Sequence, residues 1–539
     1  MKRCPNCQRV YADESLKFCR ADGAPLAAVS PDLEGATLVK LPAAGEGPTE
    51  LLGGGGGRTS SSLTRPLPPQ GRRRRPPRAI DSLAVLPLSN ETGEQQAEYL
   101  TDGITESIIN SLSQLPKLRV VPRATVFRYK GAGADPLAAG RDLGVRAVLA
   151  GRMLQLGDQL VVSVELVDVA LESQIWGEQY RHKHEGIFDL QERISREIST
   201  KLRLRLTGEE RRRLAKRYTE STEAYHLYLK GRYYLNKRTT EWIKRGIEHL
   251  RRAIDLDPSY ALAYAGLADA YAFLASSTGE QPPAEFYPKA AAAALKALEL
   301  DEGLAEAHTS LGFFRLLYEW DFEAAAREFR RAVELNPSYA NAHDGQSFYF
   351  KATGQHERAL RACRKVQELD PLSLFASVST AWAYYFARQY ERAAEQNRRA
   401  LDLDPRFFFA HWSLGLCHAV LGRLEEAAES LERAVEYSDD GVTFKAHLGY
   451  VYGLAGRRTE ARLVLEEFGA LAGRRYVSPY YPAIVHLGLG EHDRALEWLG
   501  RALEDRTGFL VFLRVEPMFD PLREDARFQE LERRVGPPS

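Results

Sequence analysis

Three cysteines and an aspartate near the start of the chain have the spacing of a metal site. Cys4 and Cys7 are separated by two residues, and Cys19 precedes Asp22 at the same interval. Two thiolates from one tight turn can hold one side of a Zn²⁺ ion, and a second turn can complete a tetrahedron. We therefore expect Cys4, Cys7 and Cys19 to bind zinc. The fourth ligand is Asp22, a water molecule or a group from another chain.

The stretch from residue 1 to residue 26 resembles a short zinc ribbon. The resemblance implies a structural zinc ion that folds a peptide too short to build a core of its own. No histidine lies near these cysteines in the sequence, so the pattern favours a structural role over a hydrolytic one.

A second group of reactive side chains, Asp102, Thr105 and Glu106, lies in the next part of the chain. Clustered carboxylates could hold a metal ion or move a proton. These residues also stand where a helix is expected to begin. We therefore predict that Thr101 or Asp102 caps this helix, and that the neighbouring side chains face solvent at the positive end of the helix dipole. Trp176 is expected in the core.

The sequence lacks the common catalytic signatures. It contains no phosphate-binding G-x-x-x-x-G-K-[ST], no H-E-x-x-H, no G-x-S-x-G and no kinase-type H-R-D or D-F-G. We therefore predict a protein that is not an enzyme. A hidden activity such as nucleotide cyclisation or phosphoryl transfer, in a kinase- or cyclase-linked pathway, is a minor alternative.

Composition narrows the class of protein further. Lys plus Arg and Asp plus Glu both number 73, so no net charge attracts nucleic acid or an anionic membrane. No apolar run approaches the length of about 18 residues needed to span a membrane, and the first residues lack the apolar centre of a secretion signal. We expect a cytoplasmic protein. Cys363 and Cys417 are expected to be packing residues within helices.

Residues 27–78 are rich in Gly, Pro, Ser and Leu and include four consecutive arginines at positions 72–75. This composition cannot build a core, so we predict a flexible linker. The arginines are expected to be a solvated flank, and contact with nucleic acid or acidic lipid is the alternative.

Residues 79–207 have the pattern of an open α/β sheet with a partly antiparallel edge. Strands are expected at residues 82–88, 118–121, 146–154, 159–167 and 175–180, and helices at 99–115, 136–143 and 187–206. The two strands around Gly157-Asp158 are expected to form a hairpin.

Several phrases of this domain resemble the amino-terminal-type domain of TolB found in bacterial signalling proteins. They are residues 84–88 (AVLPL), 99–106 (YLTDGITE), 143–146 (LGVR) and 175–178 (IWGE), of which the DGITE phrase is the most specific. The resemblance implies an α/β domain that commonly precedes tetratricopeptide repeats. It also implies a role in signalling.

The rest of the chain repeats with a fixed period. Pro337, Pro371 and Pro405, each preceded by Asp or Asn, recur every 34 residues. Such a period indicates stacked helix-turn-helix units, none of which can bury its apolar face alone. The spacing of small residues, large residues and prolines within each period resembles that of the tetratricopeptide repeat. We predict a superhelical all-α solenoid of about eight units over residues 219–506, beginning near residues 223, 261, 305, 340, 374, 408, 442 and 476.

Four departures from the repeat pattern and one terminal element are expected. The first unit has an additional stretch around Lys237–Thr240. The second unit contains about ten extra residues near 276–286, the third has one extra residue near Tyr318-Glu319-Trp320, and the first helix of the eighth is shortened by Pro479 and Pro482. Residues 507–539 are expected to cap the open end of the stack, with a charged helix from Phe519 to Val535.

The resemblance also implies a binding surface. In tetratricopeptide arrays the second, fifth, ninth and twelfth residues of each first helix line the concave groove. The aromatic residues at these positions are Phe313, Phe348, Phe375, Trp382, Tyr385, Phe409, Trp412 and Tyr450. Aromatic rings suit the anchoring of a peptide or helix because they offer a large area with few rotors. Packing between repeats, or a register error of one residue, is the alternative explanation.

These observations together favour a scaffold or adaptor in bacterial signalling that binds a protein or peptide partner in the repeat groove. The second hypothesis is a regulator of transcription or signalling that contacts nucleic acid through the zinc segment or the arginine run.

Overall fold

The computed structural model describes most of the chain after residue 79. Described are residues 2–3, 10–11, 27–28, 80–91, 98–131, 135–156, 159–183, 187–202, 204, 206–237, 239–276, 281–439 and 441–537. The chain divides into two compact units, Met1–Arg74 and Arg75–Ser539. The expected zinc ligands Cys4, Cys7, Cys19 and Asp22, and the arginine run at 72–75, lie outside the described residues.

Within the described part of the first unit, three two-residue strands pair antiparallel in the order β2-β1-β3. They are β1 (Lys2–Arg3), β2 (Val10–Tyr11) and β3 (Ala27–Ala28).

The second unit begins with the predicted α/β sheet. Its described strands are β4 (Ser82–Val85), β5 (Ser89–Asn90), β6 (Arg119–Val120), β7 (Ala147–Leu156), β8 (Gln159–Asp168) and β9 (Ser173–Lys183). The order is β6-β4-β7-β8-β9, and β5 pairs with β7. Strand β4 is parallel to both neighbours, whereas β7, β8 and β9 are antiparallel. All four residues of β4 are buried, as expected for a central parallel strand. The predicted open sheet with an antiparallel edge is confirmed.

The helices of this domain follow the sequence signals closely. They are α1 (Glu98–Ser113), α2 (Arg123–Val126), the 3₁₀ turn η2 (Phe127–Tyr129), α3 (Pro136–Asp142), α4 (Ile187–Lys201) and α5 (Gly208–Leu214). The long helix predicted for residues 187–206 is wrong at its end, because α4 stops at Lys201. A new helix starts at Gly208 instead, where Thr207 and Glu210 form a reciprocal capping box.

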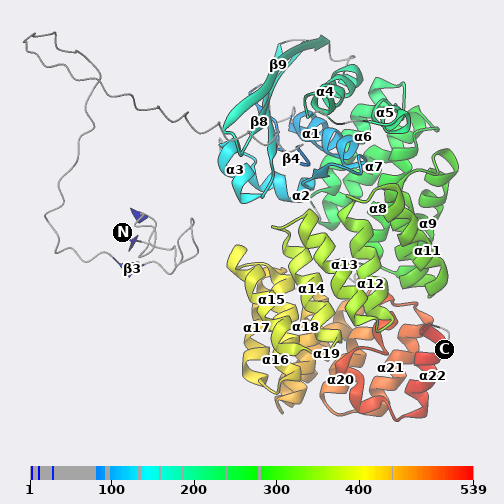
Figure 1. Ribbon diagram of the computed structural model, residues 1–539. Coiled ribbons are helices and arrows are strands. Elements are labelled where there is room, and N and C mark those ends of the chain that lie inside the picture. Colours follow the sequence, from blue (N-terminus) through cyan, green and yellow to red (C-terminus); the bar gives the residue numbers. More distant parts are fainter. Residues whose placement is uncertain are drawn as a thin grey trace, which may run out of the picture. The chain divides into compact units, whose positions relative to one another are not determined.

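The array follows as antiparallel helix pairs (Figure 1). In the described residues there are eight pairs: α6 (Thr222–Leu235) with α7 (Thr240–Leu256), α8 (Ala261–Ser276) with α9 (Pro283–Leu300), α10 (Ala305–Phe314) with α11 (Phe322–Leu335), α12 (Ala340–Ala352) with α13 (His356–Leu369), α14 (Leu374–Phe386) with α15 (Tyr390–Leu403), α16 (Phe408–Val420) with α17 (Leu424–Tyr437), α18 (Val442–Leu454) with α19 (Arg458–Ala472), and α20 (Tyr480–Gly488) with α21 (His492–Glu504). Seven of the eight first helices begin within one residue of the predicted start.

Close packing within the array depends on glycine at particular points. A Cβ atom at Gly345 would lie 2.3 Å from the ring of Phe329, and one at Gly312 would lie 2.7 Å from the same ring. The buried ring of Phe329 therefore fits between two successive first helices only because neither carries a side chain there.

Three of the four expected departures from the repeat have a structural counterpart, and the stretch at 237–240 lies partly outside the described residues. In the second unit α9 begins at Pro283, so part of the inserted stretch lengthens this helix to 18 residues. The extra residue of the third unit is taken up by a π-helical turn, η4 (Arg315–Glu319), followed by Trp320 at φ 60°. The first helix of the eighth unit, α20, has nine residues and starts after Pro479.

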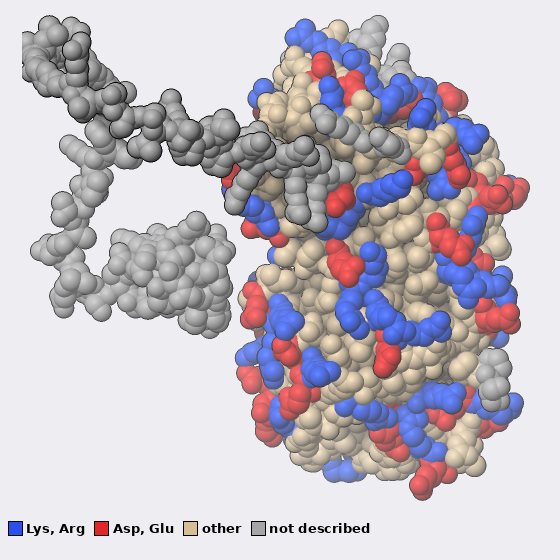
Figure 2. Space-filling model, viewed as in Figure 1, with Lys and Arg blue, Asp and Glu red and all other residues tan. Residues whose placement is uncertain are grey.

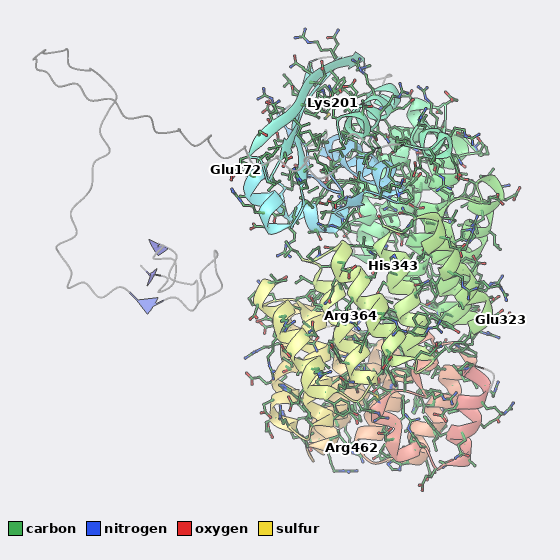
Figure 3. All side chains as sticks on the ribbon, viewed as in Figure 1. Glu172, Lys201, Glu323, His343, Arg364 and Arg462 are labelled. Carbon is green, nitrogen blue, oxygen red and sulfur yellow. The ribbon has the colours of Figure 1, made fainter. Side chains whose placement is uncertain are left out.

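A histidine recurs near the start of two first helices. His343, labelled in Figure 3, donates from Nε2 to the Pro337 carbonyl at 2.9 Å. His411, 68 residues later, donates to the Pro405 carbonyl at the same distance. Burial lowers the pKa of both imidazoles, which suits neutral rings that donate to a carbonyl. The Asn-Pro and Asp-Pro turns are thus tied to the helices that follow them.

The C-terminal residues depart from the prediction. The charged helix α22 (Ala526–Val535) begins seven residues later than expected, after the 3₁₀ turns η5 (Gly508–Phe512) and η6 (Pro517–Leu522). Residues 506–522, here called the C-terminal segment, turn back toward the middle of the array (Figure 1). The guanidinium of Arg506 donates to the Tyr318 carbonyl at 2.9 Å. The segment thus packs inside the superhelix in addition to covering its last repeat.

Candidate functional site

The first helices of the array, helices of the α/β domain such as α1 and α2, and the C-terminal segment line a cavity of about 1950 Å³. Six of the eight predicted groove residues line it: Phe313, Phe348, Phe375, Trp382, Phe409 and Trp412. The other two, Tyr385 and Tyr450, do not. The count along each first helix therefore identified the concave side for six positions.

Aromatic side chains of units five to seven form one continuous group, here called the aromatic surface. Its members are Phe375 and Trp382 on α14, Phe407, Phe408, Phe409 and Trp412 at the start of α16, and Phe444 on α18, and all line the cavity. Ring centroids of Trp382 and Trp412 lie 5.0 Å apart, and Trp412 lies 5.7 Å from Phe444. Phe375 lies 5.2 Å from Phe407, with the ring planes nearly perpendicular. These are favourable aromatic geometries.

Phe375 is the most accessible member of the aromatic surface. Its side chain is 61% exposed, although large apolar residues of a folded chain are usually covered. The sequence prediction did not include Phe407, Phe408 and Phe444, because none of them stands at a second, fifth, ninth or twelfth position. The run of three phenylalanines at positions 407–409 was the available signal.

Tyr385 faces the C-terminal segment. Its side chain is 1% exposed, and its hydroxyl donates to Glu516 Oε1 at 2.7 Å. Burial raises the pKa of Glu516 to about 7, although hydrogen bonds from Tyr385 and from the Met518 amide favour the ionised form. Nearby, Arg388 donates to Asp520 at 2.8 Å. The chain itself therefore occupies the concave position of Tyr385.

Tyr450 is also taken up by packing within the array. It is 7% exposed, and α20 approaches its backbone so closely that a Cβ atom at Gly488 would lie 2.2 Å from the Tyr450 carbonyl oxygen. This crossing is tighter than the repeat pattern alone indicates, and it removes Tyr450 from the cavity wall.

A lysine lies beside the aromatic surface. Lys351, at the twelfth position of the fourth unit, lines the cavity but is only 2% exposed. Its Nζ donates to Ser379 Oγ at 2.9 Å and lies 3.4 Å from the Ser379 carbonyl oxygen. The Ser379 hydroxyl in turn donates to Asp344 at 2.7 Å. Lys351 stands at a predicted groove position, although the predicted binding residues there were all aromatic.

The acidic residues of α1 are not arranged as predicted. Helix α1 begins at Glu98, so neither Thr101 nor Asp102 is its cap, and Asp102, Thr105 and Glu106 are buried instead of facing solvent. The prediction failed because distant elements cover these residues: Asp102 pairs with Lys130, Thr105 accepts from the Leu88 amide, and Glu106 pairs with Arg232 of the array. Trp176 is 8% exposed, as expected for a core residue.

Glu106 joins the α/β domain to the first repeat. Its carboxylate pairs with Arg232 of α6 at 2.8 Å and with Arg123 of α2 at 2.9 Å, and it accepts from Asn236 at 2.9 Å. Burial acts to raise the pKa of Glu106, but the charges of Arg232 and Arg123 outweigh it, so the pKa falls below its ordinary value. The Glu106 carboxylate has a structural role, because each arginine around it is paired with Glu106 or with a neighbouring carboxylate.

The turns between repeats also contact the α/β domain. Asn336 donates to Ser113 at 3.3 Å, and the Thr125 hydroxyl donates to Asp370. Burial raises the pKa of Asp370 to about 7. The dipeptides Asn336-Pro337 and Asp370-Pro371, which define the period of the sequence, thus also hold the domain against the array.

Other reactive groups in the described residues are built into packing. Cys363 and Cys417 are free thiols buried in repeat helices, which confirms their predicted role. Among the described residues, no group of three or more His, Cys, Asp or Glu side chains could hold a metal ion. Of the helices in the described part of the chain, none is long and apolar enough to cross a membrane. On the face drawn in Figure 2, acidic and basic side chains are intermixed.

Comparison with known families supports the two parts of the second unit separately. Residues 379–442 match the sequence model of the tetratricopeptide repeat, so the array contains tetratricopeptide repeats. Residues 79–197 match the model described as HilA/YgeH-like transcriptional regulator, second domain. The likeness of this domain to the TolB amino-terminal type remains a prediction.

Two curated proteins are similar over part of their length. "Putative adenylate cyclase 3" of Rhizobium meliloti is 33% identical over 210 residues, which cover 37% of this chain and 36% of that protein. The transcriptional regulator HilA of Salmonella typhimurium is 25% identical over 284 residues, which cover 52% of this chain and 49% of HilA. The chain thus spans about a third to a half of these relatives. A solved tetratricopeptide repeat protein from Parabacteroides merdae is 14% identical, with a TM-score of 0.37 over 50% of this chain and 100% of that one.

Proposed function

We propose that this chain is a non-enzymatic interaction scaffold that binds a segment of a partner protein on the aromatic surface of its repeat array. The observation that carries the proposal is the 61% exposure of Phe375 within a group of rings that lines the cavity. Exposed clusters of large apolar side chains mark binding sites because leaving them in water is unfavourable.

The construction of the surface suits this role. Its rings are held by one another and by α14, α16 and α18, so few rotors remain to be frozen when a partner binds. Large, rigid aromatic side chains dominate the energetics of many protein interfaces. We further propose that the partner belongs to a bacterial signalling pathway and that binding takes place in the cytoplasm.

Affinity capture with the full chain tests the proposal. Phe375→Ala should reduce the recovery of at least one retained protein by about tenfold, as expected for loss of an interface anchor. The matched control is Leu463→Ala, which removes a 57% exposed apolar side chain on α19, outside the cavity wall. If both variants retain the same proteins in the same amounts as the wild type, the aromatic surface is not the binding site.

A second candidate function is that of a transcription or signalling regulator that contacts nucleic acid through the zinc segment or the arginines at 72–75. The match of residues 79–197 to a regulator domain favours it. A gel-shift assay with the full chain, compared with a variant in which all four arginines are alanine, would show salt-sensitive binding that the variant loses. Binding that is equal in both, or absent, removes this candidate.

The similarity to the Rhizobium meliloti protein favours, as a minor alternative, a cyclase-linked pathway with catalytic activity of this chain's own. Formation of cyclic AMP from ATP by the purified full chain would support that alternative, and no formation above a blank would exclude it.

A further inference from the structure

The C-terminal segment packs against part of the cavity wall and shows which side chains that wall can bind. In the C-terminal segment, the ring of Phe512 stacks on Phe386 at 5.0 Å and lies 5.6 Å from Phe348. Three residues earlier, Phe509 stacks on Tyr480 at 5.6 Å. One part of the cavity wall therefore holds a short 3₁₀ turn through aromatic side chains spaced three residues apart.

The same segment places an acidic side chain against the wall. Glu516, four residues after Phe512, is 5% exposed and bonds to the Tyr385 hydroxyl. The groove thus takes apolar anchors together with a carboxyl group that meets a polar group of a first helix.

The aromatic surface continues from this occupied part of the wall and has comparable chemistry. Trp382 of α14 contacts both Tyr385 and Phe386, at 5.3 and 5.4 Å between ring centroids, so the two parts share one helix. Phe375, Ser379 and Trp382 follow one another at intervals of four and three residues, which places them on one face of α14.

The polar group on this face is the ammonium of Lys351. It bonds to Ser379, between Phe375 and Trp382 along the helix. Its Nζ also lies 4.6 Å from the centroid of Phe348, within the range of a cation–π contact. Lys351 thus takes the twelfth position of α12, the position that Tyr385 takes in α14, and its neighbour Phe348 lies between it and Phe512 of the occupied part.

Lys351 lacks a direct counter-ion. Among the ion pairs of the described residues, none includes Lys351, and its nearest carboxylate link runs through the Ser379 hydroxyl to Asp344. Lysine is rarely buried without a paired carboxylate, because removing an ammonium from water is costly. Two bonds to Ser379 leave the third N–H donor of the ammonium for another acceptor.

We infer that the partner segment carries an acidic side chain beside aromatic or large aliphatic residues. Its carboxylate pairs with Lys351, and its apolar side chains pack on Phe375 and Trp382. The inference rests on the proposed function and specifies the chemistry of the partner at the same site.

Two synthetic peptides serve as probes. One copies residues 508–519 (GFLVFLRVEPMF) with an N-terminal fluorophore, and the other carries Gln in place of the glutamate that corresponds to Glu516. Fluorescence anisotropy with the full chain should give a dissociation constant about tenfold lower for the glutamate peptide, because a desolvated charge pair is lost in the other.

Variants of the protein show which residues cause the preference for the glutamate peptide. Lys351→Met should bring the two dissociation constants within about twofold of each other, since the charge partner is gone. Phe375→Glu, at an exposed position that does not threaten folding, should abolish the preference by placing a carboxylate one turn of α14 before Ser379, the residue to which Lys351 bonds. Tyr385→Phe should leave the preference unchanged, because Tyr385 serves the chain's own segment.

Three results would overturn the inference: no binding of either peptide, equal binding of both by the wild type, or a preference that survives in Lys351→Met or Phe375→Glu. Loss of the preference in Tyr385→Phe alone would also overturn it, because the peptide would then be exchanging with the C-terminal segment. Protein capture that depends on Phe375 together with any of these results would leave the proposed function standing without this inference.

Discussion

The buried carboxyl of Glu516 predicts that the stability of the chain depends on pH in a particular direction. The pKa of this group is raised to about 7 from an ordinary value of 4.5, mainly by burial. Between these values the native chain keeps a proton that the unfolded chain has released. Stability therefore falls as pH rises through this window, and the loss is complete above the native pKa.

The size of the effect follows from the shift. Raising the pKa from 4.5 to about 7 corresponds to about 3 kcal/mol of unfolding free energy, of which about 2 kcal/mol is lost between pH 5.5 and pH 8. Glu516→Gln removes the titration and keeps an oxygen that can accept from Tyr385. The variant should therefore gain stability relative to the wild type by about 2 kcal/mol as the pH is raised from 5.5 to 8.

Urea denaturation of the full chain at both pH values, followed by tryptophan fluorescence, measures this difference. Glu323→Gln is the matched control, because Glu323 lies at the surface (Figure 3), its side chain is 86% exposed, and its pairing with Arg327 is a surface ion pair of small effect. The control should show no comparable pH-dependent gain. A difference between wild type and Glu516→Gln that is the same at pH 5.5 and pH 8 would refute the reasoning.

Three further predictions concern the rest of the chain. Glu106→Ala leaves the partly buried Arg232 and Arg123 without their carboxylate and should lower the unfolding free energy by about 3–5 kcal/mol in urea titrations; a loss below about 1 kcal/mol would contradict the described network. Val85→Asp places a charge in the fully buried strand β4 and should make residues 80–207 sensitive to protease, whereas unchanged resistance would show that the strand is not central. The expected zinc site should give one zinc ion per chain by atomic absorption, reduced in Cys4→Ser, and a metal-free wild type would exclude it.

The repeat could be predicted from the sequence because its contacts are local. Each unit packs mainly on its neighbours, so Pro337, Pro371 and Pro405 fix the period, and seven helix starts follow within one residue. The α/β sheet could be predicted for a similar reason, because its strands and hairpin have a short-range apolar pattern in the sequence.

The contacts that were not predicted join residues that lie far apart in the sequence. Glu516 reaches Tyr385 across 131 residues, and Glu106 reaches Arg232 across 126. A local pattern can show that a helix carries acidic residues, but it cannot show which distant element covers them. The self-occupied part of the groove and the burial of α1 were therefore not predicted.

Lys351 shows a different limit. The same count of groove positions that gave Phe348 and Trp382 also places Lys351 on the concave side. From sequence alone, however, a lysine at such a position is expected to be solvated. In the folded chain Lys351 contacts the ring of Phe348 on the same helix and Ser379 on the next repeat. Only the three-dimensional arrangement distinguishes a buried ammonium from an exposed one.

Site-specific photocrosslinking tests the central claim most directly. A benzoylphenylalanine residue is placed at position 375 or, as a control, at position 463 of the full chain, and each variant is irradiated in the organism that encodes it. Because both positions are exposed, at 61% and 57%, the probe is equally accessible. The account predicts a discrete protein adduct from position 375 that position 463 does not form. Adducts of the same size from both positions, or from position 463 alone, would contradict it.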